Sequence, residues 1–228
     1  MHQFADRPSR SNLVVPDRTI PFIANSEDNA HCFEAVVGMI RAHFQPQVDR
    51  SWGSLRDITG KTALNASWPL CAALRLREAG YIIRYQEDFD FKRFASEGVV
   101  YLRERFGHEI ASFEEQNSNI PAEMARAQTL SDAGIASHRA VTIDDIRGAL
   151  QDGFLVSVLV NSSALADRDG YCGHYLLIYN MNDRGVVCHD PGLPGEAQRF
   201  ITHEKFDRAW AFPSQRERNM LALKYPQV

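Results

Sequence analysis

The chain has 228 residues, of which 44% are hydrophobic and 24% charged, with a formal net charge of -4. These values are typical of a globular protein that buries a substantial core, and they exclude the basic footprint of a nucleic-acid-binding protein. The N-terminus lacks the apolar segment of a secretory signal, and no run approaches the ~18 apolar residues of a membrane span. We therefore expect a cytoplasmic protein with no nucleic-acid or membrane partner. Its four cysteines are expected to be thiols rather than a disulfide framework.

The first strongly patterned stretch is a helix expected over residues 32–44. Residues 1–20 before it are polar and contain two prolines, so we interpret them as an N-terminal extension. Apolar side chains at 33, 36, 37, 40 and 44 have helical spacing, and Pro46 ends the pattern. Residues of capping type stand at 26, 28 and 29. Cys32 is thus expected in the first turn, where the helix dipole and free amide groups stabilise a thiolate or an oxyanion.

The middle of the chain predicts further helices and one strand. Ser67, Pro69 and Gly80 give the cap, first turn and stop of a helix, and a strand follows over 81–85. A helix over 91–106 is expected to break near Gly98. The segment 107–140 is polar and mixed, apart from a candidate helix over 121–130. We interpret this segment as an insertion or lid on a smaller core.

The last third predicts most of the sheet. Thr142 caps a helix over 142–150, and a buried strand follows over 154–160. Two apolar strands joined by a turn make a hairpin over 173–192. Further elements are expected at 198–201, 203–210 with Thr202 as its cap, and 219–225. Helices followed by an antiparallel sheet predict one α+β domain over 21–228.

Three residues in this pattern suggest nucleophilic catalysis. The hairpin should place His174, at the start of one strand, beside Asp190, at the end of the next. A histidine oriented by a carboxylate serves as a general base, and Cys32 supplies a nucleophile at a helix N-terminus. A cysteine in an apolar helix is often only a buried hydrophobe, so the combination carries the hypothesis rather than Cys32 alone.

The motifs also resemble a known family. A cysteine that opens an apolar helix, a later Gly-His-x-apolar stretch, and a β run into His-Asp-Pro-Gly are similar to papain-like cysteine peptidases of the bacteriocin-leader-processing type. The resemblance covers about residues 21–210. It implies a papain-like α+β fold, the catalytic residues Cys32, His174 and Asp190, and no cofactor. It also implies a peptide, amide or thioester substrate, including one borne by a carrier or leader.

The chain departs from the family on the oxyanion side. The family places a glutamine six positions before its cysteine, where this chain has Ser26, and it has glycine after the cysteine, where this chain has Phe33. We expect Ser26, Asn25 or Asn29 to replace the glutamine, beside the Cys32 amide. Residues expected to line the substrate pocket are His31, Cys172 and Gly173. These departures leave peptidase, amidase and acyl-transfer activities open.

Two other functions compete with the thiol enzyme. Cys172, His174, Cys188 and His189 are zinc-ligand types near one hairpin, although no established zinc spacing is present and neighbouring strand residues point to opposite faces. We therefore assign no metal. A noncatalytic binding module is the other alternative, favoured by the absent glutamine. The sequence indicates neither the substrate nor the oligomeric state.

Overall fold

The computed structural model describes residues 14–15, 19–62 and 67–226. A seven-stranded sheet in the order β2-β1-β7-β3-β4-β5-β6 runs through this part of the chain. Its strands are β1 (Ile82–Glu87), β2 (Ala136–His138), β3 (Leu155–Asn161), β4 (Gly173–Asn182), β5 (Gly185–Asp190), β6 (Glu196–Thr202) and β7 (Asn219–Lys224). The expected α+β class is confirmed.

The sheet is mixed rather than purely antiparallel, so that part of the expectation is wrong. β1 and β2 pair in parallel, whereas the other paired strands are antiparallel. A parallel pair needs a long crossover connection, and four helices lie between β1 and β2 in the sequence. The polar segment 107–140 contains the end of this crossover, which its weak periodicity did not reveal.

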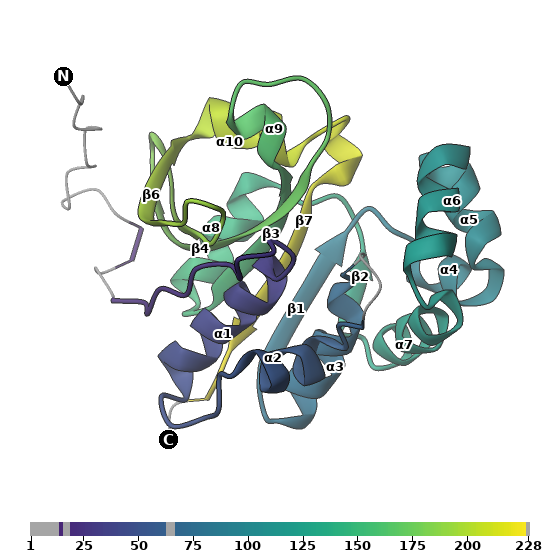
Figure 1. Ribbon diagram of the computed structural model, residues 1–228, viewed down its shortest axis with the longest axis horizontal. Coiled ribbons are helices and arrows are strands. Elements are labelled where there is room, and N and C mark those ends of the chain that lie inside the picture. The colour runs from purple at the N-terminus through teal and green to yellow at the C-terminus, as the bar shows by residue number, and fades with distance from the viewer. Residues whose placement is uncertain (1–13, 16–18, 63–66, 227–228) are drawn as a thin grey trace.

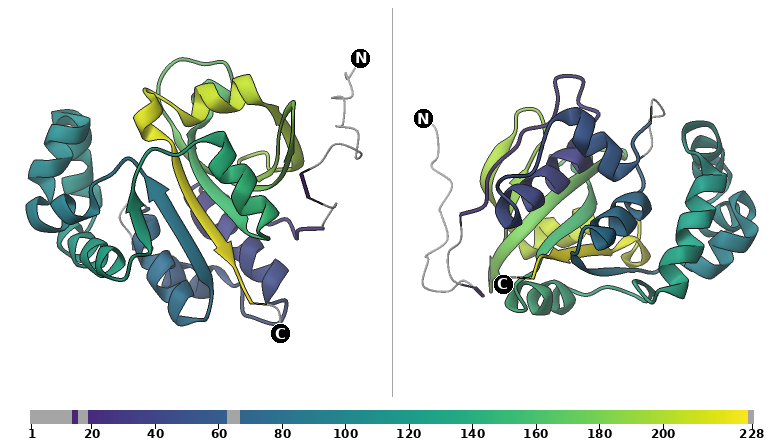
Figure 2. Two further views of the ribbon diagram at one scale, coloured as in Figure 1. Left: turned by 180° about the vertical axis from the view of Figure 1, so that it is seen from behind. Right: turned by 90° about the horizontal axis from the view of Figure 1, so that it is seen from below.

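Helices cover both faces of the sheet (Figures 1 and 2). One face is covered by α1 and its neighbours, and the opposite face by α8 and α10. Helices α4 to α7 form a helical arm beside β1 and β2. The helices are α1 (Cys32–Phe44), α2 (Trp52–Thr59), α3 (Pro69–Glu78), α4 (Phe91–Glu97), α5 (Val99–Phe106), α6 (His108–Asn117), α7 (Ile120–Asp132), α8 (Ile143–Gln151), α9 (Ser162–Leu165) and α10 (His203–Trp210), with a 3-10 turn η2 (Gln215–Glu217).

Strand alternation divides the hydrophobic core into two layers. In β4, Tyr175 and Leu177 face the cluster formed with α1, whereas Leu176 and Ile178 face the cluster formed with α8 and α10. All four side chains are buried. A strand covered on both faces is expected to be apolar at successive positions, as β3 and β4 are. The hairpin that bears His174 is therefore held rigidly at the centre of the fold.

The cap predictions are confirmed for two helices and wrong for two others. Thr142 makes a reciprocal capping box with Asp145, and Thr202 accepts from the Lys205 amide. Trp68, not Ser67, is the N-cap of α3, where Pro69 already fills the first position with a residue that has no N–H group. The N-cap of α1 is His31, which makes no side-chain cap.

The predicted lid segment is ordered as α6, α7 and β2. Helix α7 packs on α3 and α4, and α6 packs on α5. The N-terminal extension predicted over 1–20 lies largely outside the described residues, except that Val14 donates its N–H to Met181 O at 2.8 Å. Within the described ranges, none of the helices combines the length and apolar character that a membrane crossing requires.

Candidate active site

Cys32 is the first residue of α1 and lies half-buried at the edge of the core. Helix α1 packs across β4, and the Phe33 and Tyr175 rings make contact with centroids 4.5 Å apart. The buried ring of Phe33 fills the space between helix and sheet. It also fixes the start of α1 against the start of β4.

His174 lies at that start of β4, beside the end of β5. Its Nε2 donates to Asp190 Oδ1 at 2.7 Å, and both side chains are about nine-tenths buried. β4 and β5 pair in antiparallel fashion, as the hairpin prediction required. The predicted proximity of His174 and Asp190 is therefore confirmed. A charge-assisted hydrogen bond of this length fixes the orientation of the imidazole ring.

The Cys32 thiol lies close enough to the same imidazole to contribute to the raised pKa of His174. Since Nε2 is committed to Asp190, Nδ1 is the ring nitrogen left for the sulfur. Burial lowers the pKa of His174, but the hydrogen bond to Asp190 and the nearby Cys32 thiol outweigh burial and raise that pKa to about 9. The thiolate is the nucleophilic form of cysteine. Three groups that are far apart in the sequence therefore lie together, with His174 bonded to Asp190 and near the Cys32 thiol.

Asp190 is held by more partners than the sequence suggested. Burial raises the pKa of Asp190, whereas the bonds to His174 and to the Gly192 amide, together with the nearby charges, lower it to about 2. The Gly192 N–H donates to Oδ1 at 2.9 Å, and Arg199 from β6 forms an ion pair with Oδ2. A Cβ at Gly192 would lie 3.0 Å from Oδ1, so this close approach favours glycine.

Arg199 and Gly192 are site residues that sequence reasoning missed. The Pro-Gly that follows Asp190 was a recognisable turn signal, yet it did not indicate a hydrogen bond to the carboxylate. No signal was available for Arg199, because its contact with Asp190 arises only from the pairing of β5 with β6.

The proposed oxyanion residues lie together in the loop before α1. Asn25 Oδ1 accepts from the amides of Ser26 and His31, and Asn25 Nδ2 donates to Asn29 Oδ1 at 2.9 Å. The Ser26 hydroxyl lies 2.6 Å from Asp28 and 2.7 Å from His31 Nδ1. These hydrogen bonds hold the loop in shape.

The first turn of α1 supplies further donors. No side chain caps this helix, and the first amide with an i-4 partner is that of Ala35, which donates to His31 O. The first amides of a helix point outward and favour negative charge. The backbone N–H of Asn25 also donates to Pro191 O at 2.7 Å, and this bond connects the loop before Cys32 to the turn after Asp190. Both halves of the site are thus joined directly.

Of the three residues expected to line the substrate pocket, two are exposed and one is buried. Cys172 and Gly173 are exposed, next to His174, with the Cys172 amide bound to Asn161 Oδ1 at 2.9 Å. His31 is buried instead, with its ring 5.4 Å from that of Trp52. His31 therefore supports the loop rather than forming an open wall of a pocket.

The metal alternative has no assembled ligand set. Among the described residues, no group of three or more His, Cys, Asp or Glu side chains could hold a metal ion. His189 donates from Nε2 to Ile20 O and accepts at Nδ1 from the Gln198 amide. Burial raises the pKa of the Cys188 thiol well above its ordinary value. His189 and Cys188 are therefore buried structural residues of the sheet.

A scan against protein-family models found no match to this chain. A search of curated proteins found no relative either.

Proposed function

We propose that this protein is a papain-like cysteine hydrolase or acyltransferase that acts on a peptide, amide or thioester bond. One observation carries the proposal: His174 bonds to Asp190 at 2.7 Å and lies beside Cys32, at the start of a buried helix. A helix that presents cysteine to a sheet-borne histidine and carboxylate is also what the papain-like resemblance implies.

The geometry supports a two-step reaction. The Cys32 thiolate attacks the carbonyl carbon, and the resulting oxyanion is stabilised by amides of the first turn of α1. His174 protonates the leaving amine or thiol, which departs and leaves a thioester on Cys32. His174 then removes a proton from water or an acceptor amine, whose attack releases an acid or an amide and restores the thiol. No cofactor takes part in these steps.

The experiment that tests this function compares two cysteines. Labelling with iodoacetamide at pH 6 and peptide mapping should modify Cys32 much faster than Cys172, which is exposed, because His174 lies beside the Cys32 thiol. His174→Ala should remove the advantage of Cys32 and leave Cys172 unchanged.

In a panel of peptide, amide and thioester substrates, Cys32→Ala should abolish turnover, whereas Cys172→Ala retains it. Turnover that survives Cys32→Ala contradicts the mechanism.

A noncatalytic binding protein is the second candidate function. It is favoured by the oxyanion loop, where the Asn25 and Ser26 side chains are engaged within the loop itself. The two functions differ in one result: a binding protein would retain a substrate-like peptide without forming an acyl-enzyme. Mass spectrometry after acid quench detects the acyl adduct on Cys32 that only the enzyme would form.

A further inference from the structure

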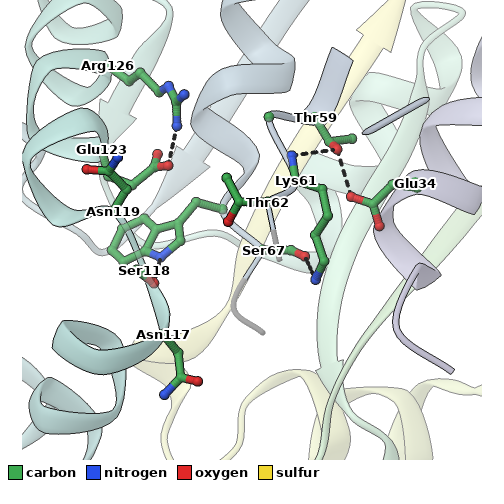
Figure 3. A pocket seen from close by; sticks show the side chains of 12 residues that line it. Glu34, Thr59, Lys61, Thr62, Ser67, Asn117, Ser118, Asn119, Glu123 and Arg126 are labelled. Atoms are coloured by element: carbon green, nitrogen blue, oxygen red, sulfur yellow. Dashed lines mark hydrogen bonds and ion pairs between the residues drawn. The ribbon is translucent and has the colours of Figure 1, made fainter. Parts of the chain in front are cut away.

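A polar cavity lies beside the first turn of α1 and is lined by side chains from several elements (Figure 3). It encloses about 50 Å³ between the first turn of α1, the end of α2, the start of α3 and helix α7. Glu34 contributes to its wall only two residues after Cys32. Because successive residues turn by about 100°, the two side chains leave the helix on nearly opposite sides. The cavity is therefore separate from the site formed by Cys32, His174 and Asp190.

Glu34 has an unusual environment for a carboxylate. Its side chain is fully buried, and Oε1 accepts one hydrogen bond, from the Thr59 hydroxyl at 2.7 Å. Among the residues that the structure describes, Oε2 has no hydrogen-bond partner. A buried carboxylate is costly unless it is paired with a cation and its remaining lone pairs are satisfied. Lys61 and Arg126 also line the cavity, where the Lys61 ammonium bonds to Ser67 Oγ at 2.8 Å and Arg126 pairs with Glu123. The space beside Glu34 Oε2 is the place where a further cationic donor would fit.

Glu123 lies on the facing wall and has a second vacant acceptor (Figure 3). It is 6% exposed, and Arg126 forms an ion pair with its Oε1. Its Oε2 has no hydrogen-bond partner within the described part of the chain. Burial raises the pKa of Glu123 to about 7 despite Arg126. Two buried carboxyl groups with vacant oxygens thus line one small space.

The indole of Trp68 favours an organic ligand in this cavity. Its indole lines the same cavity, with its N–H committed to Glu114 and Ser118 at 2.9 Å and its ring stacked on Phe94. An indole beside a carboxylate is a favourable setting for a cation with an organic shape. A metal ion would instead need several ligands converging on one point, and the described residues contain no such cluster.

We propose that this cavity binds the head group of an organic cation, a primary ammonium or a guanidinium, which donates N–H to Glu34 Oε2. Glu123 Oε2 is a second acceptor on the facing wall. One water needs roughly 10–15 Å³ on the same measure of volume, so the cavity holds about three to five water-sized atoms. That is the size of a guanidinium or a short alkylammonium group, not of a whole peptide.

The test is isothermal titration calorimetry of the full chain with methylguanidine and, separately, with ethylamine, against matched sodium chloride. At least one of these cations should bind with a Kd in the millimolar range or tighter. Glu34→Gln should weaken that binding at least tenfold, because it removes the charge that the cation neutralises. Glu109→Gln, at an exposed position in α6, is the matched control and should bind as the wild type does.

Each other outcome overturns the inference. Failure of both cations to bind the wild type, or equal binding by Glu34→Gln, removes Glu34 as the site. Tetramethylammonium has the charge without N–H donors, so equal binding of that ion contradicts the hydrogen bond. If Glu34→Gln does not fold, Glu34→Asp and Glu123→Gln take its place, and both should weaken binding. Cys32→Ala should bind normally, so this result is independent of the proposed catalysis.

Discussion

At the scale of single residues, Asp190 controls the protonation of His174. Asp190→Asn removes the negative charge and the strongest acceptor for Nε2, so the pKa of His174 should fall from about 9 by at least one unit. Titration of the histidine ring signals by nuclear magnetic resonance measures this shift. An unchanged His174 titration would contradict the assignment of Asp190.

The same substitution has a defined effect on stability. The pKa of His174 is raised, so its contribution is complete below about pH 6.5 and is lost as pH rises through 9. The pKa of Asp190 is lowered, so its contribution is present above 3.8 and is lost as pH falls through about 2. Asp190→Asn should therefore cost about 2 kcal/mol between pH 4 and 6.5 and less at pH 9, measured by urea unfolding.

Arg199 is a positioning residue that acts through Asp190. Its guanidinium holds Oδ2 while Oδ1 serves His174 and Gly192. Arg199→Met should let the carboxylate rotate and should reduce the rate of Cys32 alkylation about tenfold, a cost of roughly 1.4 kcal/mol. In the pH profile of the alkylation rate, the rise on the acid side should also move to higher pH, because Asp190 loses a neighbouring cation. A purely structural role would lower stability without moving this rise.

The matched control for Arg199 is Arg208. Arg208 also forms an ion pair with an aspartate, Asp167, but on the exposed surface of α10. Arg208→Met should leave the alkylation rate and its pH profile unchanged, since exposed ion pairs contribute little. Equal effects of the two substitutions would mean that loss of positive charge, and not the contact with Asp190, is responsible.

At the scale of elements, the turn between β4 and β5 depends on Gly185. A Cβ at this position would lie 2.1 Å from Ile201 O in β6, so alanine cannot fit unless β5 and β6 separate. Gly185→Ala should lower the free energy of unfolding by about 3 kcal/mol. Gly148→Ala is the contrasting control, because no atom lies within 4 Å of its Cβ and α8 gains helix propensity of about 0.5–1 kcal/mol. Thermal unfolding of both variants measures this difference in sign.

Elements with strong periodicity were predictable from sequence, and contacts between elements were not. The helix at Cys32, the β4–β5 hairpin and the Thr142 cap each depend on local patterns, so their prediction needed no tertiary information. The parallel β2, by contrast, depends on where the helical arm returns the chain. The His174–Asp190 contact followed from the hairpin. Arg199 and the internally bonded Asn25 loop are tertiary contacts that no local spacing records.

At the scale of the whole molecule, buried titratable groups predict an acidic optimum for stability. Burial raises the pKa of Glu87 and Glu123 to about 7, so the unfolded chain releases these protons first as pH rises above about 4.5. Stability should therefore fall between pH 4.5 and 7. The fall continues between 6.5 and 9, as the contribution of His174 is lost. Below pH 4, protonation of Asp190 acts in the opposite direction.

Urea unfolding from pH 3 to pH 9 measures this profile, which should peak near pH 4–5 and fall by on the order of 5 kcal/mol by pH 9. Two variants separate the causes. Glu123→Gln should reduce the loss of stability between pH 4.5 and 7, since the amide has no charge to bury. The part that Glu87 contributes should remain. His174→Gln should flatten the fall between 6.5 and 9 and leave the lower range unchanged. A free energy of unfolding that rises from pH 5 to 8 would contradict the burial of these groups, because the protons would then be lost first from the folded state.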